Sequence, residues 1–415
     1  MINPAAFQLD QLGWRRKVFG LLLLCLVSST ASVTYAAEKK KVISQQTYKV
    51  LMAAQESLDK GESARAIAML KKLQAALDKK AYEQAIVLQT ISHAYISQDD
   101  YTAAIPPLKR SLDLAAMPEE PQQRMHYNLI KLHMATEGFI EVIALLQSWF
   151  AMVEQPQAEP HVMLATAYLQ LGRYKEAVEP LREAIKISKE PKESWYQSLL
   201  GAYSELKHYD HCITLLHTML KLYPDRPNYW RQLVGIQLAE SKFRDALATM
   251  ELAYLRGYVE TEQEILSLAQ LYLHLNAPYK AAVLLENEIR HSRLAKTEKN
   301  WEHAANAWLL ARETGKAVAA LEKAKAKLRN PQLGLRLAQL YMASQRWVEA
   351  GKTLDTILKA GKLNATGTGQ AWILLGIAQH EAKSLPEARA AFEQAKKHRK
   401  TADSAEQWLA FLDQT

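Results

Sequence analysis

The sequence predicts an all-α protein: a right-handed solenoid of about ten antiparallel helix pairs that ends in a C-terminal cap helix. Three observations predict this fold class. A helical pattern of apolar residues returns about every 35 residues, small residues recur at one place in the well-matched copies, and glycine and proline are scarce, with 15 and 14 in 415 residues. A pair of short helices cannot bury its apolar face alone, so successive copies must stack into one continuous core.

The copy at residues 161–191 shows the pattern in its clearest form. Its first helix carries the small residue Ala165, a turn follows at Gly172, and its second helix carries Ala177. The two alanines let the helices approach closely, and Leu181 lies one helical turn after Ala177 on the same face. Period and pattern resemble those of the tetratricopeptide repeat, whose arrays present an extended concave binding surface. Copies begin near Val50, Leu88, His126, His161, Tyr196, Trp230, Ile265, Trp301, Gly334 and Trp372.

Residues 1–36 have the features of a secretory signal peptide. A basic flank precedes an apolar stretch at residues 18–27, and cleavage is expected after Ala36. That stretch is shorter than the about 20 residues that cross a bilayer, but residues 18–37 carry no charge, so an uncleaved anchor stays open as the alternative. We expect a periplasmic protein, or one anchored in the inner membrane and facing the periplasm. Membrane association is expected only if the segment is uncleaved, and a charged linker is expected at residues 37–46.

The repeats are expected to divide into a divergent part, residues 47–157, and a regular part, residues 158–400. In the divergent part the Pro106–Pro107 pair falls inside a second helix. That helix should kink or begin late, because an interior proline costs about 3 kcal/mol. Residues 401–415 are the expected cap helix, and residues 367–369 are expected to be a flexible connector that precedes a repeat helix.

Nothing in the sequence points to catalysis, so we expect no enzyme, no cofactor and no metal site. No glycine-rich loop is followed by the Lys-Ser or Lys-Thr of a phosphate-binding loop. His208, His211, Cys212 and His217 have the spacing of metal ligands in part, but they are expected to diverge, with Cys212 packed in the seam between helices. The net charge of +8 is spread along the chain and does not indicate nucleic-acid binding.

The aromatic residues of the first helices recur at one repeat position. This regularity indicates a packing slot in the core rather than a carbohydrate-binding site. The residues in this aromatic slot are Tyr95, Tyr168, Tyr203, Tyr272, Trp308 and Tyr341.

The remaining candidate site is the concave face, which the first helices line in arrays of this kind. Side-chain amides there can pair with an extended peptide backbone, while apolar residues form shallow pockets. We therefore expect a protein partner. The predicted binding residues are Val162, Thr166, Gln170, Gln197, Arg231, Leu266, Gln270, Leu273, His274, Asn306, Leu335, Gln339 and Met342.

Five short stretches carry a more specific resemblance: Trp230–Leu233, Ala248–Tyr254, Leu268–Tyr272, Pro278–Ala281 and Gln407–Ala410. They resemble one group of exported tetratricopeptide proteins that is associated with the TonB energy-transduction system of Gram-negative bacteria. The resemblance implies a periplasmic accessory protein that holds or positions subunits of the inner-membrane motor driving outer-membrane transporters.

The expected function is therefore a non-enzymatic periplasmic adaptor for protein–protein interaction, with TonB-system subunits serving iron uptake as the partners that the resemblance implies. A scaffold for peptidoglycan or polysaccharide assembly machinery is the alternative.

Overall fold

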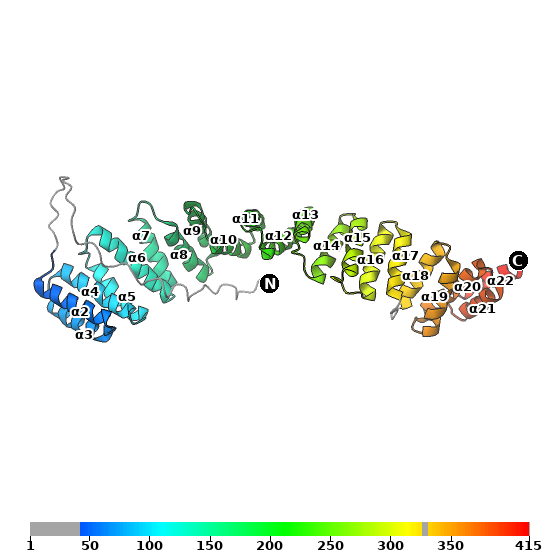
Figure 1. Ribbon diagram of the computed structural model, residues 1–415, viewed down its shortest axis with the longest axis horizontal. Coiled ribbons are helices and arrows are strands. Elements are labelled where there is room, and N and C mark those ends of the chain that lie inside the picture. Colours follow the sequence, from blue (N-terminus) through cyan, green and yellow to red (C-terminus); the bar gives the residue numbers. More distant parts are fainter. Residues whose placement is uncertain (1–41, 326–330, 415) are drawn as a thin grey trace. The chain divides into compact units, whose positions relative to one another are not determined.

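The computed structural model describes residues 42–325 and 331–414. Every regular element within these residues is an α-helix, and consecutive helices pack side by side in pairs (Figure 1). Helices α2 to α21 follow one another as ten helix–turn–helix units in the described chain, and α22 follows the last unit. The predicted all-α array with a C-terminal cap helix is confirmed. The predicted signal peptide, residues 1–36, and the first part of the predicted linker lie outside the described residues.

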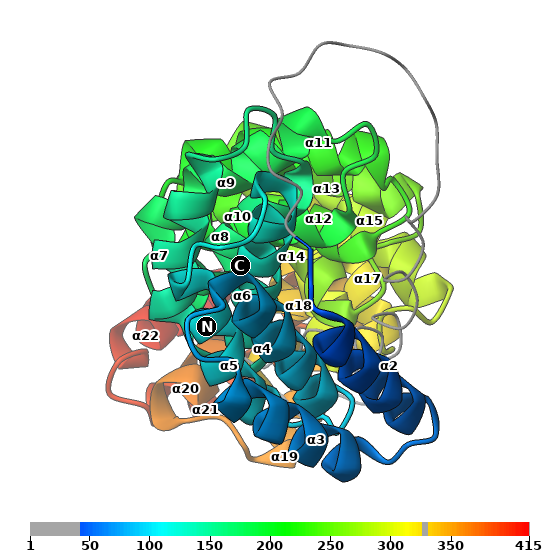
Figure 2. The ribbon, with the colours of Figure 1, turned by 90° about the vertical axis from the view of Figure 1, so that its left-hand side faces the viewer.

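The chain divides into two compact units, Met1–Leu132 and His133–Thr415, which are called unit 1 and unit 2. The helices of unit 1 are coloured blue to cyan in Figure 2. Those helices are α2 (Gln45–Asp59), α3 (Ser63–Ala76), α4 (Ala81–Ile96), α5 (Tyr101–Asp113) and most of α6 (Glu119–Ala135).

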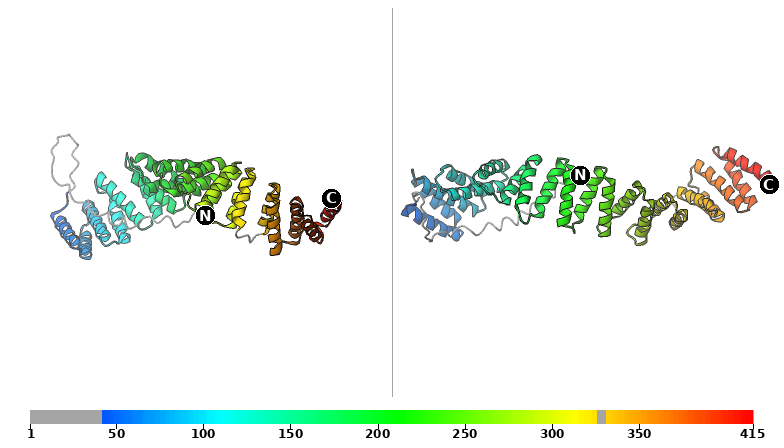
Figure 3. Two further views of the ribbon diagram at one scale, coloured as in Figure 1. Left: turned by 45° about the vertical axis from the view of Figure 1, so that its right-hand side comes forward. Right: turned by 90° about the horizontal axis from the view of Figure 1, so that it is seen from above.

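Unit 2 holds the remaining helices, each packed against the next along the chain (Figure 3). They are α7 (Phe139–Phe150), α8 (Ala158–Gln170), α9 (Tyr174–Ile187), α10 (Glu193–Glu205), α11 (Tyr209–Leu222), α12 (Pro227–Ala239), α13 (Phe243–Leu255), α14 (Glu262–His274), α15 (Pro278–Arg290), α16 (Glu298–Leu310), α17 (Thr314–Lys325), α18 (Pro331–Ala343), α19 (Trp347–Ala360), α20 (Ala365–Glu381), α21 (Leu385–Lys396) and α22 (Ala402–Gln414). None of the helices in the described chain is both long and apolar enough to cross a membrane.

The small residues of the repeat lie where the helices of a pair touch. Ala165 and Ala177 are fully buried, and Leu181 is buried beside them. Burial of an alanine at the contact lets the two backbones approach, and the following leucine fills the space between pairs. The same positions are buried in the other pairs, as at Ala66, Ala104, Ala246, Ala281, Ala305, Ala317, Ala338, Ala350 and Ala388.

The turn inside each pair contains one residue in the left-handed region, a common way to end a helix. In the pair α8 and α9 this residue is Gly172, and the N–H of Arg173 then donates to the carbonyl of Tyr168 at 2.8 Å. Only two of the ten turns use glycine, so glycine alone could not locate them in the sequence. The left-handed residues are Gly61, Asp99, Glu137, Gly172, Lys207, Ser241, Asn276, Arg312, Gln345 and Lys383.

Helix α5 runs unbroken from Tyr101 through the Pro106–Pro107 pair to Asp113, so the prediction that this helix begins late is wrong. Buried contacts with α4 hold it in place. The Ser111 hydroxyl donates to the carbonyl of Ala85 at 2.7 Å, and Ser92 of α4 donates to a carbonyl of α5 at 2.8 Å. Tertiary packing outweighs the helix-breaking tendency of the prolines.

The substitution Pro106→Ala is expected to stabilise unit 1 by about 1–2 kcal/mol. Pro106 is exposed, so alanine meets no steric conflict there. Alanine supplies the N–H that the carbonyl of Thr102, four residues earlier, lacks. Urea unfolding of the parent and the variant measures the difference, and an unchanged or lower midpoint would contradict the expectation.

Gly367 and Gly369 lie inside α20 and are buried, so the expected flexible connector at residues 367–369 is wrong. Asn364 caps the helix by accepting a hydrogen bond from the N–H of Gly367 at 2.8 Å. A Cβ atom at Gly369 would lie 2.6 Å from the Thr401 hydroxyl and 2.9 Å from His398 Cβ. Glycine at position 369 therefore permits a close approach of the segment before α22.

Candidate protein-binding surface

All the predicted binding residues lie on first helices of unit 2: α8, α10, α12, α14, α16 and α18. The exposed face of these six helices is called the first-helix surface. Its polar members differ in exposure: Thr166 and Asn306 are half-buried, and the others are exposed. The exposed ones are Gln170, Gln197, Arg231, Gln270, His274 and Gln339.

The apolar residues of the predicted site lie deeper than the polar ones. Leu335 is only 6% exposed and packs in the core with Leu354 and Leu375, so it offers almost no surface. Leu273 and Met342 are half-buried and pack against the core of unit 2, as does Leu266, while Val162 is half-buried. These apolar residues contribute mainly to the core, because each first helix is covered on both flanks by neighbouring second helices.

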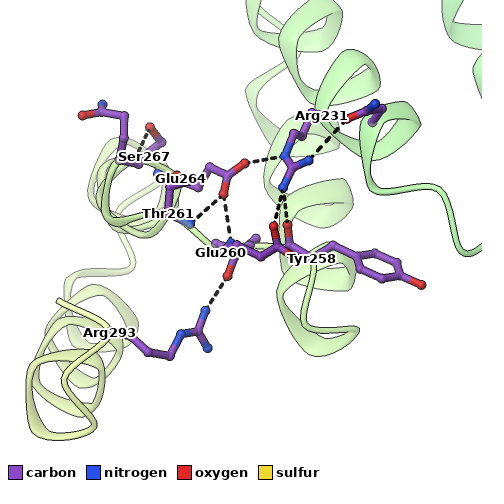
Figure 4. A network of polar contacts seen from close by, with 10 residues as sticks. Arg231, Tyr258, Glu260, Thr261, Glu264, Ser267 and Arg293 are labelled. Atoms are coloured by element: carbon purple, nitrogen blue, oxygen red, sulfur yellow. Dashed lines mark hydrogen bonds and ion pairs between the residues drawn. The ribbon is translucent and has the colours of Figure 1, made fainter.

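Arg231 of α12 is held by neighbouring groups rather than free (Figure 4). Its Nε donates to Glu264 Oε1 at 2.6 Å, and its Nη2 donates to Glu260 Oε2 at 3.1 Å. The same Nη2 lies 3.3 Å from the carbonyl oxygen of Tyr258. Its Nη1 donates a hydrogen bond to Asn228 Oδ1 at 3.4 Å. The guanidinium therefore ties α12 to the start of α14, and the sequence pattern did not indicate these partners.

Glu264 is the centre of this network. Its carboxylate also accepts from the backbone N–H groups of Glu260 and Thr261 at 2.9 Å each, and the Thr261 hydroxyl caps the helix in return. Burial opposes the charged form, but the backbone N–H groups and the guanidinium of Arg231 outweigh it and lower the pKa of Glu264 to about 2. The carboxylate is charged at neutral pH and satisfies Arg231.

Gln197 of α10 is engaged as well. Its Nε2 donates to the Tyr229 hydroxyl at 2.8 Å, and that hydroxyl donates to Glu193. Arg226 donates to the second carboxylate oxygen of Glu193 at 3.0 Å. Burial, together with the hydrogen bond to Glu193, raises the pKa of Tyr229 to about 12. These contacts join α10 to α12 within unit 2.

Three other amides have no such partners. Gln270, Asn306 and Gln339 occupy the same repeat position on α14, α16 and α18, one residue after the small residue of each first helix. Their side chains make no hydrogen bond within the described part of the chain. We call these residues the amide row. Each amide offers one acceptor and two donor hydrogens, which matches the needs of a peptide group.

The side chains that were considered as metal ligands are placed by packing instead. Cys212 is fully buried, and burial raises the pKa of its thiol to about 11, so the thiol stays protonated. The rings of His208 and His211 lie 5.6 Å apart beside Tyr203, while His217 is exposed. Within residues 42–325 and 331–414, no three His, Cys, Asp or Glu side chains are grouped to hold a metal ion.

The aromatic slot is part of the core, as predicted. Trp308 and Tyr341 are 3% and 2% exposed, and Tyr168 and Tyr203 are also buried. Tyr95 and Tyr272 pack against the cores of their own units.

Comparison with known proteins identifies the repeat directly in one copy. A family model described as tetratricopeptide repeat matches residues 158–191. A second model, described as anaphase-promoting complex subunit 5, matches residues 91–154. No curated protein matches the sequence.

Several solved structures are similar over part of the chain. A tetratricopeptide repeat protein from Parabacteroides merdae has 13% identity and a TM-score of 0.36, covering 72% of this chain and 100% of that one. The C-terminal part of a repeat protein from Cytophaga hutchinsonii has 15% identity and a TM-score of 0.35, covering 68% of this chain and 97% of its own. YrrB, described as a tetratricopeptide protein with an unusual peptide-binding site, has 13% identity and a TM-score of 0.34, covering 43% of this chain and 88% of its own.

The assignment of the fold rests on the chain's own repeat, because these TM-scores are low. Residues 158–191 contain α8 and α9, and the nine other helix–turn–helix units of the described chain repeat their left-handed turn, five of them with an aromatic residue in the same slot. The protein is therefore a tetratricopeptide-repeat solenoid.

Proposed function

We propose that the protein is a periplasmic adaptor that binds an extended polypeptide segment on the first-helix surface of unit 2. The observation that carries the proposal is the amide row: three amides at one repeat position on successive first helices, none with a hydrogen-bond partner among the residues that the structure describes. Gln270 and Gln339 are exposed and Asn306 is half-buried, so their amides can reach a partner, and a bound backbone supplies both a donor and an acceptor. Solenoids of this type act as interaction scaffolds.

The chemistry of this surface favours a neutral peptide backbone over a terminal carboxylate. The one cation predicted for the site, Arg231, already holds the carboxylates of Glu260 and Glu264. Beside the amide row, Leu273 and Met342 present only their outer edges, because both pack against the core. Such positions give shallow apolar contacts to alternate side chains of a bound strand.

We further propose that the partner is a subunit of a TonB-type energy-transduction complex and that the protein positions it in the periplasm. The resemblance at Trp230–Leu233 and Leu268–Tyr272 supports this partner, and the signal-like residues 1–36 support export. Both stretches lie in unit 2, and the second includes Gln270 of the amide row.

The double substitution Gln270→Ala with Gln339→Ala is expected to reduce capture of the partner at least about tenfold, since each lost hydrogen bond weakens binding by roughly 1 kcal/mol. Both side chains are exposed, so melting and helicity should not change. The tagged full-length protein is crosslinked in cells and purified from membrane extract, and the captured proteins are quantified by mass spectrometry.

The matched control is Gln407→Ala, an exposed glutamine of α22 away from the first-helix surface. Equal capture by the parent and the double variant would show that the amide row is not the contact. Specific capture of cell-wall synthases or polysaccharide exporters, without TonB-system subunits, would overturn the TonB assignment and favour an envelope-assembly scaffold.

A further inference from the structure

A polar contact of one kind joins α13 to the pair that follows it. Glu251 of α13 accepts hydrogen bonds from the Tyr272 hydroxyl of α14 at 2.6 Å and from Lys280 Nζ of α15 at 3.1 Å. Lys280 Nζ also lies 5.4 Å from the centre of the Tyr272 ring. One carboxylate thus bonds the aromatic slot and a cation of the next pair. We call this arrangement a latch.

The latch recurs in the next two pairs. Glu286 of α15 accepts from Trp308 Nε1 of α16 at 3.1 Å and from Lys323 Nζ of α17 at 2.8 Å. At the following junction the partners change identity but not roles: Glu322 of α17 accepts from the Tyr341 hydroxyl of α18 at 2.7 Å and from Arg346 at 3.1 Å. In each case the carboxylate stands five residues after the small residue of its helix.

The charge states agree with this geometry. Burial opposes ionisation of Glu251, but the hydrogen bonds from Tyr272 and Lys280 outweigh it, so the pKa of Glu251 lies below its usual value. Burial and the neighbouring carboxylate both raise the pKa of Tyr272. The carboxylate is charged and the phenol neutral at neutral pH, which is the combination that the hydrogen bond requires.

The junctions on both sides of these three lack the latch. At the junction of α11 and α12 the aromatic slot holds Gln237, and the carboxylate position holds His217. Gln237 is 2% exposed, and its side-chain oxygen makes no hydrogen bond within the described residues. At the junction of α19 and α20 the slot holds Gln379, whose buried oxygen is likewise unpaired, while the carboxylate Asp355 bonds Lys359 instead.

We propose that α12 to α19 form one cooperative block within unit 2, which the three latches hold together, and that the array opens first at the two glutamine junctions that bound this block. A latched junction gains two charge-assisted hydrogen bonds, whereas a glutamine junction leaves an acceptor buried without a partner. In a repeat array, stability is a sum of such nearest-neighbour terms, so the weakest junctions open first.

The block carries the whole amide row, because Gln270, Asn306 and Gln339 lie on α14, α16 and α18. The latches therefore hold these three amides at a fixed spacing before a partner binds. The junctions that bound the block allow the flanking helix pairs to change their orientation. The existence of the block does not rest on the proposed function; only its role in holding the amide row does.

Hydrogen exchange of the full chain, followed by mass spectrometry, tests the block. We expect core amides of α14 to α17 to exchange at least about tenfold more slowly than those of α10, α11 and α20, with breaks in protection at the two glutamine junctions. Equal protection across all these helices, or breaks inside α12 to α19, would overturn the proposal.

Double substitutions that swap the residues of a latched junction and a glutamine junction give the matched test. Gln237→Tyr with His217→Glu builds a latch pair at the open junction and should slow exchange of α11 and α12 about tenfold, by more than the two single changes together. The reverse pair, Tyr272→Gln with Glu251→His, should speed exchange of α13 and α14 about tenfold and leave α17 unchanged. If neither double substitution changes the rate of hydrogen exchange at its junction, the latches do not stabilise the block. Binding of the partner is measured separately, so the two proposals can fail independently.

Discussion

The substitution Gly376→Ala is expected to lower the free energy of unfolding of the C-terminal pairs by about 2–3 kcal/mol. Gly376 of α20 occupies the small-residue position that alanine fills in five other pairs. An added Cβ would lie 2.6 Å from Cδ1 and 2.7 Å from Cζ of Phe392, which is fully buried in α21. Phe392 cannot withdraw, because its ring stacks on Trp408 with centres 5.3 Å apart and an angle of 6°. Thermal or urea unfolding measures the loss.

A second substitution separates steric conflict from other causes. Five other pairs combine alanine with leucine at these two positions, as Ala338 and Leu354 do. The double variant Gly376→Ala with Phe392→Leu should therefore recover most of the lost stability, because leucine leaves room for the new Cβ. Phe392→Leu alone should cost about 1 kcal/mol through lost burial and lost stacking on Trp408. Additive losses in the double variant would refute a clash between these two residues.

The substitution Glu264→Ala is expected to lower the free energy of unfolding by about 3 kcal/mol. It removes charge-assisted hydrogen bonds to Arg231 and breaks the capping box with Thr261, contributions of roughly 1.5–3 and 1 kcal/mol. Arg231 would then keep only its longer hydrogen bonds to Glu260, Asn228 and the carbonyl of Tyr258. The expected result is a lower midpoint of unfolding and faster hydrogen exchange at the start of α14. Glu205→Gln, at an exposed carboxylate of α10, is the control and should change neither.

Glu264 also sets part of the response to acid. Its pKa in the folded protein, about 2, lies below the usual glutamate value of 4.5. The charged form is therefore favoured by folding: its contribution is fully present above pH 4.5 and is lost as the pH falls toward 2. In Glu264→Gln this part of the acid dependence should disappear, so that the stabilities of the parent and the variant converge in that interval. A constant difference between the two from neutral pH down to pH 2 would contradict the assignment.

Several features of the fold could be read from the sequence because they are local or periodic. The small residues, such as Ala165 and Ala177, and the aromatic slot at Tyr272 recur with the repeat, so their burial follows from the period alone. The failures were positions where local preference and tertiary context disagree. The Pro106–Pro107 pair lies within an unbroken helix because buried contacts with α4 hold it. Gly369 lies inside α20, and glycine is needed there because a neighbouring segment approaches too closely for a Cβ.

The binding surface was predictable only as a set of positions. Periodicity placed Gln270, Gln339 and Arg231 on first helices, and all three are exposed. Periodicity did not predict the ion pair of Arg231 with Glu264, since the two residues are one repeat apart and meet only when the helix pairs stack. Nor could it tell that Leu335 is part of the core, because the exposed and buried faces of a first helix depend on how closely the next pair packs.

By itself, the sequence determined the helix pairs, their number and the slots that must be small, aromatic or apolar, because these follow from a repeat that each unit carries within its own residues. The tertiary structure alone decided which polar side chains are satisfied inside the protein and which stay available. Those partners come from adjacent pairs, as in the bonds of Arg231 to Glu264 and of Glu251 to Tyr272. The choice among candidate partners depends on distances of a few ångströms between separate helices, which no periodicity along the chain encodes.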